Sequence, residues 1–336
     1  MNTYPEKNND ISNDPTPGSP NRGQGGVRIV FMGTPEFAVA SLKMLLDAGL
    51  NIAGVITAPD KAAGRGLQLQ QSAVKKYAVQ EGLTILQPEK LKDPVFLEQL
   101  KALNADLQVV VAFRMLPEVV WAMPTLGTIN LHGSLLPQYR GAAPINWAII
   151  NGEKETGVTT FKLQHEIDTG NILLTEKIPI GADETAGELH DRMKETGAAL
   201  LVKTVKGLIE GNLAEQPQSD GSDRDRETQL KHAPKIFTAT CHINWEKPAE
   251  EVYNLIRGLS PYPGAFTSFR GKSLKIFMAQ KIEGLHSSIL AGNFETDQET
   301  FLRFACNNGY INIIELQLEG KKKMIVADFL RGYRFD

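Results

Sequence analysis

Cysteine is scarce in this sequence. Its 336 residues include two, Cys241 and Cys306, which stand far apart and lack the short spacing of zinc-binding cysteine pairs. Two cysteines also cannot build the disulfide framework that holds small secreted domains together. We therefore expect no metal centre and no disulfide scaffold, and we expect the protein to work in the reducing cytoplasm.

Long apolar runs are missing too. No stretch reaches the roughly 18 to 20 apolar residues that a membrane-spanning helix needs, so we expect no membrane partner. Residues 1–26 lack both the apolar stretch of a secretory signal and the Arg-rich, acid-poor composition of a transit peptide. They are rich in Asn, Pro, Gly and Asp, which leaves little to bury, and this composition predicts a disordered tail.

The sequence also lacks the usual signatures of nucleotide-binding sites. FMGTPEF, which follows the first predicted strand, holds one glycine where a dinucleotide fingerprint has three. The GRG of residues 64–66 is not followed by the Lys-Ser or Lys-Thr of a phosphate-binding loop, and no Gly-x-Ser-x-Gly elbow marks a nucleophilic serine. NAD and ATP are therefore disfavoured as ligands, and covalent catalysis has little support.

From Val27 onward the sequence alternates short β-branched runs with amphipathic segments. This alternation predicts an α/β domain with a doubly wound, mostly parallel sheet that helices cover on both faces. The expected strands are 27–33, 51–57, 83–87, 105–113, 127–132, 156–163 and 172–180, and the expected helices are 35–49, 72–82, 95–103, 144–152 and 184–211.

The pattern changes after residue 211. Residues 212–231 are polar, charged and aperiodic, which is typical of a linker between domains. A second domain at 232–336 is predicted to be a small β-barrel with one helix near its start, and the length of the chain suits two domains. The expected helix is 248–260, and the expected strands are 265–270, 273–283, 301–308, 310–318 and 321–330.

Charge separates the two predicted domains. Residues 232–336 carry 13 Lys and Arg against 11 Asp and Glu, although the whole chain has a net charge of −3. Nucleic-acid binding follows local basic patches more closely than net charge. The cluster of Lys321, Lys322 and Lys323 with Arg331 and Arg334 is therefore a candidate nucleic-acid surface. A solvated strand edge protected by lysines is the alternative interpretation.

Three polar residues carry the candidate chemistry. Asn130 and His132 are two apart at the end of a predicted strand, so they share a face, and Asp168 follows the strand at 156–163. Sheet enzymes place their sites at such carboxyl ends. An amide and an imidazole can donate hydrogen bonds to a developing oxyanion, and a carboxylate can keep the imidazole charged or position a water. Taken singly, His132 is more typical of a hydrogen-bonded structural histidine, and Asp168 of a turn before Gly170.

Taken together, these motifs resemble a known family. NLHGSLLPQYRGAAPINWAI at residues 130–149, followed by IDTG at 167–170, is similar to the 10-formyltetrahydrofolate-dependent formyltransferases, whose motif couples Asn-x-His to Ser-Leu-Leu-Pro-x-Tyr-Arg-Gly. The resemblance implies a Rossmann-like catalytic domain at 27–211 and an OB-like barrel at 232–336. Further stretches resemble the members that act on aminoacylated tRNA: VRIVFMGTPEFA at 27–38, PDKAAGRG at 59–66, INWEKPAEEVYNLIRGLSPYPGAF at 243–266 and DFLRGYR at 328–334.

What the resemblance implies is transfer of a formyl group from 10-formyltetrahydrofolate to the α-amine of methionine on initiator tRNA, by a monomer without a metal. By the same match Asn130, His132 and Asp168 are catalytic. The folate site is expected at Ser134, Leu135, Leu136 and Pro137, and tRNA contacts are expected at Arg65, Lys75, Lys321, Lys322 and Lys323. The chain departs from the family after GRG, where Leu67, Gln68 and Leu69 replace the expected basic residues.

Three other functions remain open at this point. Water could replace the amine and make the protein a hydrolase of 10-formyltetrahydrofolate. The acceptor could be a small amine, such as a nucleotide sugar or glycinamide ribonucleotide. The protein could also bind RNA without catalysis and only sense folate. The basic second domain has no purpose in the first two functions, which favours the tRNA substrate.

Overall fold

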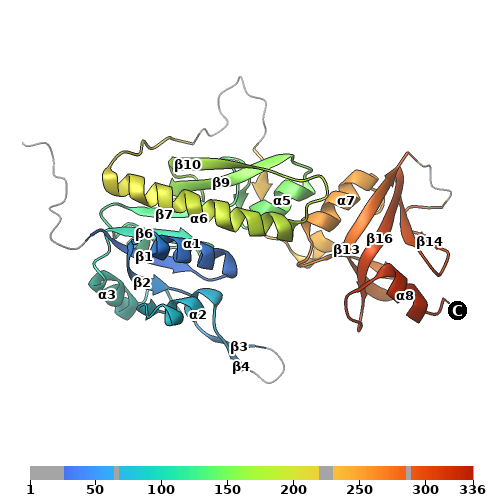
Figure 1. The fold of residues 1–336 in the computed structure, drawn as a ribbon, viewed down its shortest axis with the longest axis horizontal. Coiled ribbons are helices and arrows are strands. Elements are labelled where there is room, and N and C mark those ends of the chain that lie inside the picture. Colours follow the sequence, from blue (N-terminus) through green and yellow to red (C-terminus); the bar gives the residue numbers. More distant parts are fainter. Residues whose placement is uncertain (1–25, 64–67, 219–229, 285–288, 336) are drawn as a thin grey trace, which may run out of the picture.

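The computed structural model describes residues 26–63, 68–218, 230–284 and 289–335, which form two bodies joined end to end (Figure 1). The tail predicted at residues 1–26 lies outside the described residues, except for Gly26. Within the described ranges, no helix is long and apolar enough to cross a membrane.

A seven-stranded sheet forms the centre of the first body, in the order β10–β9–β7–β6–β1–β2–β5. The strands from β7 to β5 run parallel, while β9 is antiparallel to both of its neighbours. This is the doubly wound, mostly parallel sheet that the sequence predicts. The strands are β1 Arg28–Gly33, β2 Asn51–Ile56, β5 Ile85–Leu86, β6 Leu107–Val111, β7 Thr128–His132, β9 Glu155–Lys162 and β10 Ile172–Pro179.

Helices cover both faces of this sheet because its strands are apolar on both sides. In β1, Ile29 and Phe31 belong to the core shared with α1 and α6, whereas Val30 and Met32 belong to a separate core with α3 and α4. Successive side chains of a strand point to opposite faces, so one apolar run supplies both cores. The helices are α1 Glu36–Asp47, α2 Ala73–Gln80, α3 Pro94–Ala102, α4 Glu118–Trp121, α5 Pro144–Ile150 and α6 Ala186–Glu210.

The longest helix, α6, runs across the sheet next to β9 and β10 (Figure 1). It begins in a capping box, in which the Thr185 hydroxyl accepts from the Glu188 amide and the Glu188 carboxylate accepts from the Thr185 amide. It ends at Gly211, whose φ of 69° lies in the left-handed region that terminates helices. The helix expected at 184–211 begins two residues before the observed one and ends at the same glycine.

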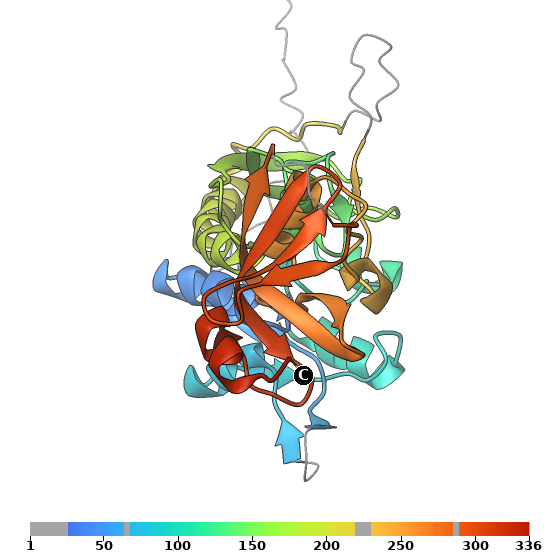
Figure 2. The same cartoon turned by 90° about the vertical axis from the view of Figure 1, so that its right-hand side faces the viewer.

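The second body is a strongly curved antiparallel sheet (Figure 2), which confirms the predicted small barrel. Its strands lie in the order β12–β13–β16–β15–β14, and β17 adds to β16. The helix α7 (Ala249–Gly258) packs against β13 and β16, and a 3₁₀ turn at Thr238–Cys241 precedes it. The strands are β12 Ala265–Phe269, β13 Lys272–Glu283, β14 Phe294–Thr296, β15 Leu302–Cys306, β16 Gly309–Leu318 and β17 Met324–Ile325.

The strand expected at 321–330 is wrong over most of its length. β17 covers two residues, and the chain then turns into α8, Val326–Gly332. Asp328 lies in the first turn of α8 and pairs with Arg331 one turn later, while Phe329 and Leu330 are buried in the barrel core. Burial of the Phe329 and Leu330 side chains in the barrel core outweighs the β preference of the preceding Met-Ile-Val run.

Two features of the first body have no periodic signal in the sequence. The loop after β2 forms a hairpin, β3 Lys61–Ala63 and β4 Gln68–Gln70, which projects away from the sheet (Figure 1). Residues 212–218 and 230–233, here called the interdomain segment, contact the first body, and the rest of the predicted linker, 219–229, lies outside the described residues. Gln216 pairs with Ile172, and β11 (His232–Ala233) pairs with β8 (Arg140–Gly141) in parallel.

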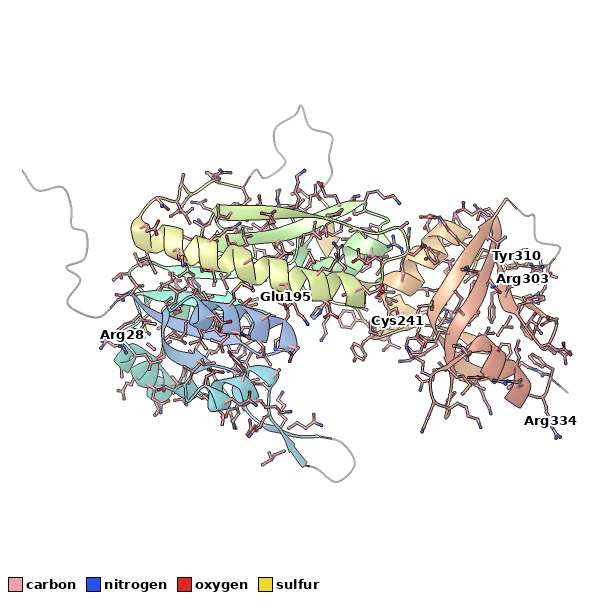
Figure 3. The ribbon with its side chains drawn as sticks, viewed as in Figure 1. Arg28, Glu195, Cys241, Arg303, Tyr310 and Arg334 are labelled. Atoms are coloured by element: carbon pink, nitrogen blue, oxygen red, sulfur yellow. The ribbon has the colours of Figure 1, made fainter. Side chains whose placement is uncertain are left out.

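The two cysteines are free and buried. Cys241 lies where the two bodies meet (Figure 3), and burial raises the pKa of Cys306 to about 12. A thiol with a raised pKa is a poor nucleophile, so both cysteines are packing residues.

Candidate active site

The sheet changes direction of winding at β1. The chain adds β2 and β5 on one side of β1 and then crosses to add β6 and β7 on the other. The loops that follow β1 and β6 therefore leave the sheet in different directions, and doubly wound sheets commonly bind their ligands at such a point. β7 ends at the same edge, with Asn130 and His132 in its last three residues.

Asn130 and His132 share one face of β7, as their spacing predicts. Leu131 points to the opposite face, where it belongs to the core that α6 covers. His132 is buried, whereas Asn130 is partly exposed. Among the described residues, no hydrogen bond of the Asn130 side-chain amide is found. That amide is therefore available to a ligand.

The protein fixes the orientation of the His132 ring. Nε2 lies 2.9 Å from the backbone oxygen of Tyr139. A carbonyl oxygen only accepts, so Nε2 must carry a hydrogen in both charge states of the ring. Nδ1 then faces Asp168 Oδ2 at 3.9 Å, within ion-pair range but too long for a direct hydrogen bond. A proton gained by His132 would therefore reside on the side of Asp168.

Asp168 is held in a strained conformation by contacts on both its side chain and its backbone. Its φ of 55° places a non-glycine residue in the left-handed region, which costs of order 1 to 3 kcal/mol. Oδ2 accepts a hydrogen bond from the Gly141 amide at 3.0 Å, and the backbone oxygen accepts one from Gln218 at 2.9 Å. A Cβ on Gly170 would lie 1.6 Å from the Lys162 oxygen, so the IDTG loop needs a glycine there.

The predicted folate loop, Ser134 to Pro137, is anchored by internal hydrogen bonds. The fully buried Ser134 donates to the Gln138 oxygen at 2.6 Å, so its hydroxyl shapes the loop. Thr159 of β9 donates to the Ser134 oxygen at 2.7 Å and accepts from the Leu136 amide at 3.2 Å. Leu136 is buried, while Leu135 and Pro137 are partly exposed. Sequence reasoning missed Thr159, because nothing marks it among the threonines of β9.

Thr159→Val should lower the free energy of unfolding by about 1 to 3 kcal/mol, because it leaves the Ser134 oxygen and Leu136 amide without their buried partner. Thr156→Val is a matched control on the same strand. Thr156 Oγ1 is buried and has no hydrogen-bond partner among the described residues, so its loss should be neutral or stabilising. Urea unfolding of both variants tests this, and equal changes would contradict the anchoring role of Thr159.

Tyr139 and Gly141 attach the YRG loop, residues 139–141, to the interdomain segment. The Tyr139 amide donates to the Lys231 oxygen at 2.7 Å, and its hydroxyl donates to Glu153 at 2.5 Å. Burial and the Glu153 acceptor raise the pKa of Tyr139, so the phenol stays protonated at neutral pH. A Cβ on Gly141 would lie 2.4 Å from the Ala233 oxygen, which explains the glycine. The sequence alone gave no sign of these contacts.

Glu153 holds the same segment from the side. Burial acts to raise the pKa of Glu153, but hydrogen bonds from Lys231 and Tyr139 outweigh it and lower the pKa. The Lys231 ammonium lies 2.5 Å from Glu153 Oε1. An ionised Glu153 therefore ties the end of the interdomain segment to the loop that carries Tyr139.

The residues predicted to contact tRNA lie in different surroundings. Arg65 lies outside the described residues. Lys75 is paired with Asp60 at 2.5 Å and is mostly buried, so much of its charge is neutralised. Lys323 pairs with Glu315 at 2.7 Å and lies 5.3 Å from the centre of the Phe277 ring. Lys321 and Lys322 are exposed in the turn before β17, and their ammonium groups have no carboxylate partner in the described part of the chain.

The loop after β6 adds an apolar surface to the same edge of the sheet. Met115 is 72% exposed there, beside the buried Leu116. Arg114 donates to the backbone oxygens of Pro88 and Glu89, which ties this loop to the one after β5. Among the described residues, no group of three or more His, Cys, Asp or Glu side chains has the arrangement to hold a metal ion.

Two family models match most of the chain. The model described as "Formyl transferase" matches residues 27–205, and the model described as "Formyl transferase, C-terminal domain" matches residues 235–334. The chain belongs to the formyl transferase family. The resemblance that the Asn-x-His and IDTG motifs predict is thereby confirmed.

Individual members of the formyl transferase family are similar over almost their whole length. The methionyl-tRNA formyltransferase of Parabacteroides distasonis is 54% identical over 314 residues, which cover 92% of this chain and 96% of that relative. The methionyl-tRNA formyltransferase of Flavobacterium johnsoniae is 50% identical over 317 residues, with 92% and 97% covered.

Solved structures of more distant proteins share the fold. The N-formyltransferase from Helicobacter canadensis, in complex with folinic acid and dTDP-3-aminofucose, superposes with a TM-score of 0.63 at 22% identity, covering 89% of this chain and all of that one. HypX from Aquifex aeolicus, in complex with tetrahydrofolic acid, gives a TM-score of 0.61 at 18% identity, covering 91% of this chain and 47% of that one. These two likenesses show the fold alone.

Proposed function

We infer that this protein transfers the formyl group of 10-formyltetrahydrofolate to the α-amine of methionyl-initiator tRNA, giving N-formylmethionyl-tRNA and tetrahydrofolate. The observation that carries this inference is the identity of about half of all residues to methionyl-tRNA formyltransferases, over 92% of the chain. The arrangement of Asn130, His132 and Asp168 at one edge of the sheet supports it. We also expect the protein to act as a monomer in the cytoplasm.

The amine does not need a strong base. An ordinary α-amino group titrates near pH 7.7 to 8.0, and an ester in place of the carboxylate lowers that value, so much of the amine is neutral at about pH 7. Its nitrogen forms a bond to the formyl carbon, and the bond from that carbon to the folate nitrogen breaks. The attacking nitrogen loses a proton and the leaving nitrogen gains one. The task left to the protein is to stabilise the oxyanion between these steps.

The site geometry suits that task. The Asn130 amide has no partner among the described residues, and His132 presents Nδ1 toward Asp168 while Nε2 is held by Tyr139. We propose that the Asn130 side-chain amide and the Nδ1–H of protonated His132 donate to the formyl oxygen, because Nε2 is already bonded to Tyr139 while Nδ1 makes no direct hydrogen bond to Asp168. The Asp168 carboxylate stabilises the imidazolium and helps the proton to pass from the amine to the leaving nitrogen.

The surroundings of these residues fit a folate. The exposed Met115 offers an apolar contact, and the loop of Ser134 to Pro137 offers backbone groups held in place by Thr159. We propose that folate binds along this loop through shape and backbone hydrogen bonds, because the Ser134 hydroxyl is already used internally. A preformed loop lowers the ordering cost of binding.

One assay separates this function from its rivals. The protein is incubated with 10-formyltetrahydrofolate and methionyl-tRNA, and with each of them alone, while formylated methionyl-tRNA and free formate are measured. We expect formyl transfer that requires both substrates and little formate without tRNA. Rapid formate release without tRNA would identify a hydrolase, and transfer to a sugar amine or glycinamide ribonucleotide in preference to tRNA would identify a small-molecule enzyme.

The second domain is proposed to supply affinity for tRNA through Lys321 and Lys322. Replacing both lysines with glutamine should raise KM for methionyl-tRNA several-fold, leave kcat nearly unchanged and make log KM less sensitive to log salt, because fewer counterions are released from the phosphates. The measurement is a series of kinetic runs at increasing KCl. Lys203→Gln with Lys206→Gln, two exposed positions on α6, makes the same charge change elsewhere. Equal effects of the two pairs would show a response to net charge only.

A further inference from the structure

The interdomain segment reaches into the candidate active site at Gln218. The Gln218 side chain forms four hydrogen bonds with groups of the site. Its Oε1 accepts from Arg140 Nε at 3.1 Å and from Arg140 Nη2 at 2.6 Å. Its Nε2 donates to the backbone oxygen of Asp168 at 2.9 Å and to that of Gly170 at 2.7 Å. One amide thus joins the YRG loop to the IDTG loop.

The hydrogen-bond partners of Gln218 fix the orientation of its side-chain amide. Arg140 can only donate and the two backbone oxygens can only accept, so oxygen must face the arginine and nitrogen must face the loop. Neither a glutamate nor a methionine could replace all four bonds. The side chain is partly buried, and the neighbouring Gln216 fastens the segment to Ile172 through backbone bonds in both directions. The backbone hydrogen bonds of Gln216 therefore fix the position of Gln218 two residues later.

The positions of both Asp168 and His132 depend on the interdomain segment. Asp168 sits in a left-handed conformation that its neighbours must maintain, and Gln218 bonds to its backbone oxygen and to that of Gly170 two residues later. The same segment also supports His132. The backbone oxygen of Lys231 accepts a hydrogen bond from the Tyr139 amide, and the backbone oxygen of Tyr139 accepts one from His132 Nε2. The segment therefore supports Asp168 through Gln218 and His132 through Tyr139.

We propose that Gln218 is a positioning residue for the formyl-transfer reaction. It holds the Asp168 carboxylate at its place opposite His132 Nδ1 by clamping the IDTG loop to Arg140. This inference rests on the proposed function. It assigns a role in the chemistry to a segment whose composition indicates only a connection between domains.

Gln218→Ala in the full chain should lower kcat for methionyl-tRNA formylation about 10- to 100-fold, because a displacement of the order of 1 Å at a catalytic group has such an effect. KM for 10-formyltetrahydrofolate and for tRNA should change less than about three-fold. Gln216→Ala is the matched control, since it removes the same side chain two positions earlier and keeps the backbone bonds to Ile172. It should retain parental kcat.

A double-mutant test distinguishes positioning from general support of the fold. If Gln218 acts through Asp168 and His132, Gln218→Ala should cost less than about three-fold in a His132→Ala background. The same 10- to 100-fold loss in both backgrounds would overturn the proposal. So would unchanged kcat in Gln218→Ala, or a loss confined to KM for tRNA.

Gln218→Glu covers the case in which the alanine variant does not fold. It keeps an acceptor for Arg140 but loses the donor to Asp168 and Gly170, so it should lose kcat to a similar extent; parental kcat in this variant would also overturn the proposal. If the parent protein itself forms no formylmethionyl-tRNA, the proposed function fails. If the parent is active and Gln218→Ala is equally active, only the role of Gln218 fails.

Discussion

Alanine in place of His132 or Asn130 should lower kcat for formyl transfer by about 10² to 10³, the usual effect of removing one oxyanion donor. The binding of folate and of tRNA should change little, because both donors act mainly on the charge that develops in the transition state. Steady-state kinetics with both substrates, together with equilibrium binding of each, measure the two effects separately. A larger change in folate affinity than in kcat would make these residues binding groups.

Two further variants separate chemistry from packing. His132 is buried, so alanine leaves a space, whereas His132→Gln keeps an N–H donor near the Tyr139 oxygen but removes Nδ1 from the side of Asp168. It should be as inactive as His132→Ala. Asn130→Asp keeps the shape but turns a donor toward the oxyanion into a negative charge, so it should be at least as impaired as Asn130→Ala. Near-parental kcat in either variant would remove that residue from oxyanion stabilisation.

Much of the first body could be predicted because the apolar residues of its strands and helices recur at a clear spacing. β1 follows from VRIVFMG, whose residues fill two cores in turn, and α6 follows from a capping box at Thr185 and a glycine at residue 211. The β3–β4 hairpin and α8 could not be predicted in this way. The hairpin strands are three residues long, and α8 depends on the burial of Phe329 and Leu330 against strands that come earlier in the chain.

The candidate catalytic residues Asn130, His132 and Asp168 could be proposed from the sequence. The spacing of Asn130 and His132 puts them on one face of a strand, and residues after neighbouring strands meet at one edge of the sheet. Their supports could not be proposed. Gln218 and Lys231 lie in an aperiodic segment, and their contacts with Arg140, Asp168 and Tyr139 depend on how the chain returns from α6. Composition predicts that such a segment connects two domains but does not predict what it touches.

The same contacts bear on dividing the protein into separate parts. A chain ending at Glu210 would lose Gln216, Gln218 and β11 together with the second domain. The IDTG and YRG loops would then lack their shared support, so loss of activity in such a fragment would not by itself show that the second domain binds tRNA. Substitutions at Lys321 and Lys322 in the full chain avoid this ambiguity.

Asp168→Asn should lower kcat by about 10² to 10³ while leaving the fold intact. Asparagine keeps an oxygen for the Gly141 amide and readily adopts the left-handed conformation that Asp168 has, and the bond from Gln218 goes to the backbone. What disappears is the negative charge 3.9 Å from His132 Nδ1, which stabilises the imidazolium. The measurement is kcat for methionyl-tRNA formylation beside thermal unfolding of the same variant.

Glu166→Gln is the matched control for the Asp168 substitution, because it removes the same charge two residues earlier from an exposed side chain in the same loop. It should retain parental kcat. Asp168→Ala should be at least as impaired as Asp168→Asn, since it loses both the charge and the bond to Gly141. In a His132→Ala background, Asp168→Asn should have only a small further effect, because the charge acts through the imidazolium. An undiminished loss there would mean that Asp168 acts on the amine or the leaving nitrogen independently of His132, and parental kcat in Asp168→Asn alone would exclude its charge from the mechanism.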